Sequence, residues 1–516
     1  WKLSMSSSSR NYNRAAPKAF ASLLVALSYP TFALAAGTSI VESVSVQGSG
    51  ASDVASGIAY DQQGAVVVSG STGGSLGGPN QGGIDAFAGK FDAAGQQLYI
   101  RQFGTTGYDT SNDVAVDADG NIFVAGVAGS LEGASAGSFG TFVRKYNSAG
   151  DLQWTNQFGI SSGDMANGVA VDLAGNVWVT GQTDGALDGP SQGGRDSFVR
   201  KYDTAGNMIW GKQWGTGLWD VSQAVTTDHL GNGYITGFNF PGLHSSTDQQ
   251  DFFVTKFDPE GNVVWTRTQG GPLLDQSIEL TTDSAGNVYI TGITKNQLGD
   301  TQFGSGDIFV AKYDPSGTLL WTKQYGTGLN ENGYAIQVDA AGNIFVGGSA
   351  SNNPNGGPIT SSQGIVLSLD ADGNERWKQV LNLFPIDGVS DIALGEPGVV
   401  YAVAAIGTSL SSPDGFFIAK IRDVSDEESY QAWISNFGAS VMPATSEDGN
   451  GDGVIDAADY TVWRDHLGMT TGSGAGAIGT VPEPATLVLL AIGGALAFVW
   501  HPCEFRPRQR RVTLLT

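Results

Sequence analysis

The loop from Asp448 to Asp459 carries residues suited to metal binding. It places side-chain oxygens at loop positions 1, 3, 5, 9 and 12 and a glycine at position 6. Calcium prefers about six to eight oxygen ligands on a sharply turned backbone. The spacing therefore predicts one Ca²⁺ site with the ligands Asp448, Asn450, Asp452, the carbonyl of Val454, Asp456 and Asp459. The alternative is an ordinary turn rich in Asp, Asn and Gly.

A single acidic residue recurs along the chain at intervals of 55 or 56 residues. The positions are Asp53, Asp109, Asp164, Asp220, Asp275, Glu331 and Asp387. If the strand after each acid lines a central channel, the seven carboxylates encircle one mouth and attract a cation or grip a ligand. Alternatively, each carboxylate accepts backbone N–H groups in the turn that leads into its own strand.

The elements that position these acids form a repeat of the same length. The segment DVAVDADGNIFVAG at 113–126 recurs as GVAVDLAGNVWVTG, AVTTDHLGNGYITG and AIQVDAAGNIFVGG. In each repeat, alternating apolar runs flank this turn and a second turn, as in FVRKYDTAGNMIW. Four short antiparallel strands per repeat are the unit of a propeller blade.

Seven repeats are present, but the seventh ends after Phe416–Ile421 without a fourth strand. The apolar segment Ile40–Gln47 stands before the first repeat, at the spacing of a fourth strand. We therefore expect an all-β, seven-bladed propeller over residues 37–422, closed when the N-terminal strand completes the last blade. One aromatic residue begins the fourth strand in six repeats, and we expect packing between blades rather than ligand stacking from Tyr99, Trp154, Trp210, Trp265, Trp321 and Trp377.

Both ends of the chain have the pattern of targeting segments. Arg10, Arg14 and Lys18 precede an apolar stretch that closes on small residues, which predicts a signal peptide over 1–36. A first membrane helix is the alternative. Near the other end, Val481-Pro-Glu-Pro484 is followed by an apolar run to Trp500 and by a cluster of arginines.

These patterns resemble known families. The D-x-x-G-N-x-Y-x-T-G core and the F-x-x-K-Y-D-x-x-G-x-x-W half resemble the SBBP family of bacterial β-propeller repeats, which implies a propeller but no activity. The segment 481–511 resembles the PEP-CTERM sorting signal of Gram-negative bacteria. That resemblance implies an exosortase-type processing enzyme as a partner and a location at the cell surface or in the extracellular matrix. The alternative is a plain membrane anchor.

The segment 423–469 resembles a degenerate dockerin. Tyr430–Gly438 matches Tyr460–Gly468, and an aspartate closes the calcium loop where other such loops have glutamate. The first calcium loop is missing, because Lys420 and Arg422 occupy its ligand positions. The resemblance implies a small α-helical, calcium-dependent docking module for a cohesin-like protein, with docking residues at Ala457, Ala458 and Arg464. A linker rich in Gly and Ala, 470–480, separates it from the sorting segment.

Composition limits the remaining functions. A formal net charge of -24 argues against binding to nucleic acid, and four histidines with one cysteine leave little material for zinc or haem. We therefore expect an exported, non-catalytic propeller that binds a glycan, such as an exopolysaccharide, or a protein, and that contacts the membrane only through its C-terminal tail. The alternative is a carbohydrate-active hydrolase or lyase, since paired carboxylates could act as acid and base.

Overall fold

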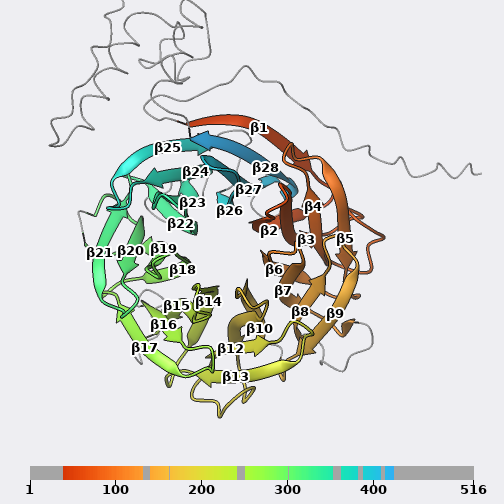
Figure 1. Cartoon of the computed structure of the whole chain (residues 1–516), viewed down its shortest axis with the longest axis horizontal. Helices are drawn as coiled ribbons and strands as arrows, with labels where there is room; N and C mark the ends of the chain where they lie inside the picture. The colour runs from red at the N-terminus through yellow and green to blue at the C-terminus, as the bar shows by residue number, and fades with distance from the viewer. Residues whose placement is uncertain are drawn as a thin grey trace, which may run out of the picture. The chain divides into compact units, whose positions relative to one another are not determined.

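The computed structural model describes residues 39–131, 140–161, 163–240, 250–299, 302–351, 362–381, 388–407 and 413–423. These residues form a ring of seven four-stranded blades and contain no α-helix (Figure 1). The seven-bladed propeller expected from the repeats is thereby confirmed. The expected signal peptide, docking module, linker and sorting segment lie outside the described residues.

Each blade is an antiparallel meander whose first strand is nearest the axis of the ring. The first strands are β2 (Asp53–Tyr60), β6 (Thr110–Val116), β10 (Met165–Val171), β14 (Asp220–Thr227), β18 (Asp275–Thr282), β22 (Asn330–Val338) and β26 (Val389–Leu394). The second strands are β3 (Val66–Thr72), β7 (Ile122–Ala128), β11 (Val177–Thr183), β15 (Gly233–Asn239), β19 (Val288–Thr294), β23 (Ile344–Ser351) and β27 (Val399–Gly407). The third strands are β4 (Asp85–Phe91), β8 (Gly140–Tyr146), β12 (Asp196–Tyr202), β16 (Asp251–Phe257), β20 (Asp307–Tyr313), β24 (Ser362–Leu369) and β28 (Pro413–Asp423). The fourth strands are β5 (Gln97–Phe103), β9 (Leu152–Phe158), β13 (Met208–Trp214), β17 (Val263–Gln269), β21 (Leu319–Tyr325), β25 (Glu375–Leu381) and, for the seventh blade, β1 (Ser39–Gln47).

The recurring Asp-x-x-Gly-Asn sequence forms the turn between the first and second strands. In blade 2, one carboxylate oxygen of Asp117 accepts the backbone N–H groups of Asp119 and Asn121, at 3.0 and 2.8 Å. Gly120 takes a φ of 78°, a left-handed conformation that glycine adopts without a steric penalty. The aspartate and the glycine therefore fix the turn and, with it, the register of the hairpin.

The ring closes through the N-terminal strand, as the sequence predicts. β1 pairs antiparallel with β28, from Ser39 opposite Asp423 to Gln47 opposite Phe416. In Figure 1 the red strand β1 lies beside the blue strand β28. Glu42 of β1 also contacts two basic side chains of β28, Lys420 at 3.1 Å and Arg422. The last blade thus obtains its fourth strand from the other end of the propeller.

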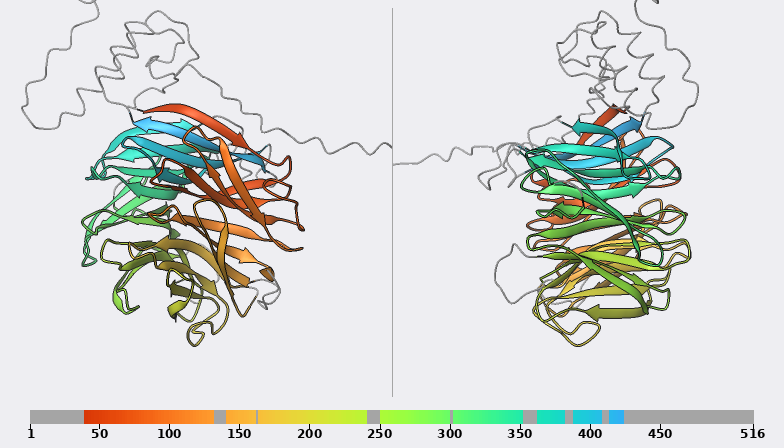
Figure 2. Two further views of the ribbon diagram at one scale, coloured as in Figure 1. Left: turned by 45° about the vertical axis from the view of Figure 1, so that its right-hand side comes forward. Right: turned by 90° about the vertical axis from the view of Figure 1, so that its left-hand side faces the viewer.

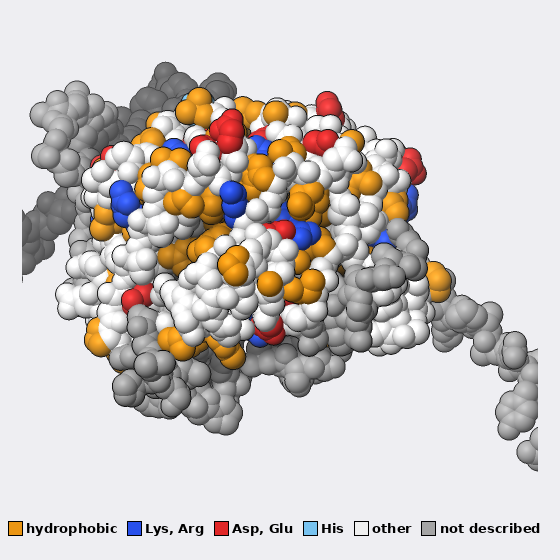
Figure 3. Space-filling view, turned by 90° about the horizontal axis from the view of Figure 1, so that it is seen from below, with side chains coloured by type: hydrophobic (Ala, Val, Ile, Leu, Met, Phe, Trp, Pro, Cys, Tyr) orange, Lys and Arg blue, Asp and Glu red, His pale blue; other side chains and the backbone are white. Residues whose placement is uncertain are grey.

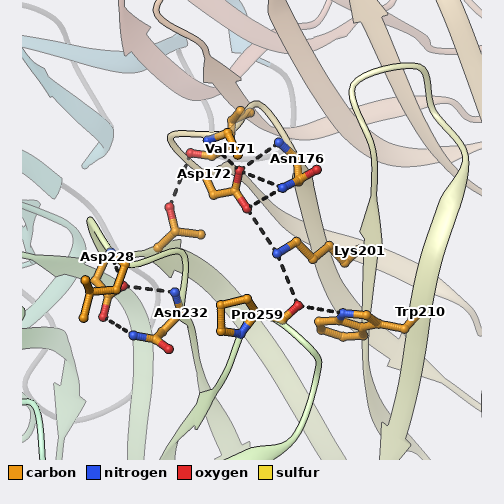
Figure 4. A network of polar contacts seen from close by, with 11 residues as sticks. Val171, Asp172, Asn176, Lys201, Trp210, Asp228, Asn232 and Pro259 are labelled. Carbon is orange, nitrogen blue, oxygen red and sulfur yellow. Dashed lines mark hydrogen bonds and ion pairs between the residues drawn. The ribbon is translucent and has the colours of Figure 1, made fainter.

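Polar contacts join neighbouring blades at several of the boundaries between them, which we call seams. Between blades 3 and 4, the Lys201 ammonium lies 3.1 Å from the Asp172 carboxylate and donates to the Pro259 carbonyl at 3.4 Å (Figure 4). The indole N–H of Trp210 donates to the same carbonyl at 3.0 Å. A Cβ on Gly261 would lie 2.8 Å from the Trp210 ring, so the ring packs directly on this glycine.

Equivalent lysine and aromatic donors meet one carbonyl at three more seams. They are Lys90 and Tyr99 on Ser148, Lys145 and Trp154 on Thr204, and Lys256 and Trp265 on Pro315. These aromatic residues therefore pack between blades, in agreement with the interpretation from their register.

Candidate binding face and central channel

The two faces of the ring differ in their connections. Because successive strands of a meander alternate in direction, the connections after the first and third strands lie on one face, the turn face. They are tight, as in the turn closed by the Asp61 N–H on the Ala65 carbonyl. The opposite face, the loop face, carries longer loops, such as those from Thr72 to Asp85 and from Thr183 to Asp196. Figure 2 shows these two faces from the side.

Large apolar side chains are exposed on the loop face. Tyr108 is 56% exposed and Trp219 is 51% exposed, each one residue before an acid of the recurring set. The Arg195 guanidinium lies 4.8 Å from the centre of the Trp219 ring, and Phe240 meets this ring edge-on. Ile160 and Phe303 are also about half exposed on connections of this face. Loops on a rigid scaffold commonly carry binding residues, so this face is the candidate binding surface.

The recurring acids lie buried at the base of the loop face. The Asp109 carboxylate accepts the backbone N–H groups of Thr105 at 2.6 Å and Gly129 at 2.7 Å, and also the Thr105 hydroxyl. In the same way, the residue four positions earlier donates its backbone N–H to Asp53, Asp164, Asp220, Asp275 and Glu331. This geometry favours the turn interpretation for these six carboxylates. Asp387 lies outside the described residues.

The electrostatic setting of these acids varies with their neighbours. Burial would raise the pKa of Asp164, but hydrogen bonds from Thr183, Ile160 and Ser161 outweigh burial and hold that pKa below its usual value. At Asp220, Asp275 and Glu331 the loss of hydration prevails, and their pKa values are raised.

The central channel is lined by the first strands of all seven blades. Two adjoining spaces of about 530 and 470 Å³ occupy it, one extending to Leu173 and His229 on the turn face. Each first strand has a β-bulge, which inserts one extra residue. The extra residues line the space nearer the loop face and are mostly polar: Ser56, Asn112, Asn167, Gln223, Ile278, Tyr334 and Ser390. The channel wall therefore presents amide and hydroxyl groups.

Three carboxyl groups stand where the two spaces adjoin, and the sequence interpretation missed them. Asp113, Glu279 and Asp391 line both spaces. Asp113 accepts the Val169 N–H of the next blade, and Asp391 accepts the Ile58 N–H, each at 2.7 Å. Loss of hydration, followed for Glu279 and Asp391 by repulsion from other carboxylates, raises the three pKa values, that of Asp113 to about 6.

A signal for these carboxyl groups was present in the repeat. Each follows an acid of the recurring set by four residues, where the other blades have Gly57, Gly168, Ala224 and Ala335. An acidic side chain at a position otherwise held by small residues marks an exception that periodicity alone does not explain.

The predicted calcium ligands Asp448, Asn450, Asp452, Val454, Asp456 and Asp459 lie outside the described residues. Within the described ranges, no group of three or more His, Cys, Asp or Glu side chains is arranged to hold a metal ion. Among those same residues, no helix is long and apolar enough to cross a membrane.

Matches to two family models support the fold and the sorting signal. A family model described as "Beta-propeller repeat" matches residues 98–130 and 153–187, and one described as "PEP-CTERM protein-sorting motif" matches residues 480–501. The sorting signal indicates export and cell-surface association in bacteria.

Curated relatives and solved structures are distant. The regulatory protein FlaEY of Caulobacter vibrioides is 26% identical over 34% of this chain and 21% of its own length. The WD repeat-containing protein L264 of Acanthamoeba polyphaga mimivirus is 25% identical over 32% and 14%. This chain thus covers about a fifth or less of either relative. The WD40 domain of Neurospora crassa Pan2 has a TM-score of 0.42 at 11% identity, over 72% of this chain and 91% of that one.

Proposed function

We propose that the chain is an exported, non-catalytic surface propeller that binds an extracellular glycan through its loop face. The observation that carries this proposal is the exposure of Trp219 and Tyr108 on the face with the longer loops. An aromatic ring offers a rigid apolar plane with a polar edge, which suits the mixed apolar and hydroxyl surface of a sugar. The polar wall of the channel supplies hydrogen-bonding groups behind the same face.

Retention of the full-length chain on immobilised polysaccharides, including bacterial exopolysaccharides, tests this function. Trp219→Ala and Tyr108→Ala should each reduce retention, by up to about tenfold in Kd for one stacked ring. Leu230→Ala is the matched control, because Leu230 is 67% exposed on the turn face. Equal retention of all variants would contradict glycan binding at the loop face. Release of reducing ends during the assay would favour the hydrolase or lyase alternative.

A protein partner is the second candidate, favoured by an apolar band on the rim of the ring. Met208, Ile209, Val263, Val264 and Leu320 of the outermost strands are each about half exposed. Figure 3 views the side of the ring that carries β13 and β17 and shows hydrophobic side chains among largely uncharged surface. Patches of this kind mark protein interfaces. Partner binding that is lost in Ile209→Asp but kept in Trp219→Ala would support this candidate.

A calcium-dependent docking module completes the proposal, with the loop Asp448–Asp459 as its single site and a cohesin-like protein as partner. Carboxylates packed this closely repel one another without a cation, so binding should be coupled to local folding. Calorimetric titration of the full-length chain with calcium should give one site, which Asp452→Ala removes. Glu447→Gln, adjacent to the predicted ligands, should leave binding intact. No binding at millimolar calcium in the wild type would contradict the module.

A further inference from the structure

Among the side chains that the structure describes, a second acidic residue faces the recurring acid at four blade boundaries. It is the first residue of the third strand in the preceding blade: Asp85, Asp196, Asp251 and Asp307. Its partners across the boundary are Asp109, Asp220, Asp275 and Glu331. At the boundary between blades 2 and 3, this position is Gly140, so no acid among the described residues faces Asp164 from this position. The chain therefore contains both the paired and the unpaired arrangement.

The pair between blades 3 and 4 places one carboxyl oxygen of each residue next to Gly215. A Cβ placed on Gly215 would lie 2.4 Å from Oδ1 of Asp196 and 3.2 Å from Oδ2 of Asp220, so both oxygens flank this glycine. Oδ2 of Asp196 accepts the Gln192 N–H and the Gln213 amide. Oδ1 of Asp196 has no hydrogen-bond partner, although the residue is 0% exposed. A buried carboxylate oxygen without a donor is unfavourable.

The same arrangement recurs between blades 1 and 2. A Cβ on Gly104 would lie 2.6 Å from Oδ1 of Asp85 and 2.9 Å from Oδ2 of Asp109. Asp85 is also 0% exposed, and its Oδ1 again has no hydrogen-bond partner. The same geometry thus occurs twice, each time with one carboxyl oxygen that has no hydrogen-bond partner. This recurrence indicates that each pair lacks one hydrogen-bond donor.

Around the Asp196–Asp220 pair, the described charged groups provide little compensation. Arg195, the neighbour of Asp196 in sequence, forms an ion pair with Asp184 at 3.0 Å and lies over Trp219. The groups that act on Asp220 are the N–H and hydroxyl of Thr216 and the carboxylate of Asp196. At the boundary between blades 5 and 6, Lys378 faces Glu331 together with Asp307.

At three of the boundaries, the pKa of the recurring acid follows the pairing. Desolvation raises the pKa of Asp220, of Asp275 and of Glu331, and repulsion from Asp196, Asp251 and Asp307, respectively, adds to each. The pKa of Asp164, whose position opposite is glycine, is lowered instead. A raised pKa thus accompanies an acid across the boundary, and a lowered pKa accompanies a glycine there.

We propose that the carboxyl pair Asp196–Asp220 holds one proton in a carboxylic acid–carboxylate hydrogen bond across the blade boundary. The proton supplies the donor that the orphan oxygen lacks and removes one of two buried negative charges. A divalent cation would need several oxygen ligands, and within the described residues no group of three or more His, Cys, Asp or Glu side chains is arranged to hold one. The ring is therefore fastened by a contact that weakens as pH rises.

The direction of the pH effect follows from the raised pKa of Asp220. A group that holds its proton more tightly when folded contributes stability that is present below its unfolded pKa of 3.8. That contribution is lost as pH rises through the folded value.

The experiment compares Asp196→Asn with Asp164→Asn in the full-length chain. The amide of Asp196→Asn carries a permanent donor in place of the proton, so the fall of Tm with rising pH above about pH 4 should be reduced relative to wild type. Asp164→Asn, at the boundary without a pair, should leave this slope unchanged. Isotope-edited infrared spectra of the wild type at about pH 4 should show a protonated carboxyl band that Asp196→Asn diminishes.

Either of two results would overturn the proposal. One is a protonated carboxyl band that Asp196→Asn does not diminish, together with equal pH slopes in wild type and Asp196→Asn. The other is a divalent cation bound in stoichiometric amount to the wild type and lost in Asp85→Asn and Asp196→Asn, with a Tm that falls on chelation.

Discussion

The repeated seams and the closing seam hold neighbouring blades together by different means. At four repeated seams, a lysine and an aromatic residue of one blade donate to the same turn carbonyl of the next. At the closing seam, β1 supplies Ser45, whose hydroxyl donates to the Gly95 carbonyl of blade 1 at 2.7 Å. Tyr401 of β27 donates to the nearby Ala93 carbonyl at 3.5 Å.

The difference shows that β1 has two roles. It completes the sheet of blade 7 through its ladder with β28, and it also reaches the turn of blade 1 where other fourth strands place an aromatic residue. The seam before it departs from the pattern as well: Trp377 is buried, but its indole N–H has no hydrogen-bond partner among the described residues. Repetition ends where the two ends of the ring meet.

Removal of Ile40–Gln47 should have the largest effect. The deletion leaves blade 7 with three strands, exposes the edge of β28 and breaks the contact with Gly95. We expect aggregation or loss of the cooperative melting transition, measured by calorimetry and light scattering. A monomeric protein with an unchanged melt would show that the ring does not depend on β1.

Trp210→Ala tests the repeated seam. The ring packs against Trp178 at 5.0 Å between centroids and against Gly261, so its removal leaves a cavity between blades and should cost about 3–5 kcal/mol. Denaturant unfolding measures this loss. Trp219→Ala, which removes an exposed tryptophan, is the matched control and should change stability by less than about 0.5 kcal/mol. Equal losses would refute the packing role.

Lys201→Met should be the next largest change. It leaves the buried Asp172 carboxylate without its cation, although Asn176 still donates to it, so we expect a loss of about 3 kcal/mol. The pKa of Asp172 is lowered, because hydrogen bonds from Asn176 and then the contact with Lys201 outweigh desolvation. This stability is present above the unfolded pKa and is lost as pH falls, so the penalty of the variant should shrink in acid. A constant penalty from neutral pH to about pH 3 would contradict this assignment.

Glu42→Gln at the closing seam should have the smallest effect. Glu42 contacts Lys420 and Arg422, but all three side chains remain partly exposed, so solvent screening limits the loss to about 1 kcal/mol or less. Although desolvation opposes it, the two basic residues hold the pKa of Glu42 below its usual value, and the contribution should disappear as pH falls. High salt should reduce the difference from wild type in a Tm series. A larger loss of stability for Glu42→Gln than for Lys201→Met would contradict the expectation that the ion pairs of the closing seam contribute less than the ion pair at Lys201.

The fold was predictable because each blade repeats its own turn chemistry. Gly120 with Asp117 fixes one hairpin, and the register of Ile40–Gln47 relative to the repeats located the closing strand. The candidate site was harder to predict from the sequence. Asp113 lies in blade 2 and Glu279 in blade 5, and only the closed ring brings them to one channel. The orphan oxygen of Asp196 depends on a side-chain direction that strand periodicity does not specify.

The most direct test of the closed ring is a disulfide across its closing ladder. Val44 lies opposite Ala419, so Val44→Cys/Ala419→Cys would link the two ends of the propeller, with Cys503→Ser to prevent exchange. The matched control is Thr255→Cys/Thr266→Cys, whose native hydroxyls lie 3.1 Å apart within blade 4. A crosslink between distant positions restricts the unfolded chain more than one between near positions. We predict a larger rise in Tm on oxidation for the closing pair than for the control; failure of the closing pair to form a disulfide, or no rise in Tm once it has formed, would contradict closure by β1.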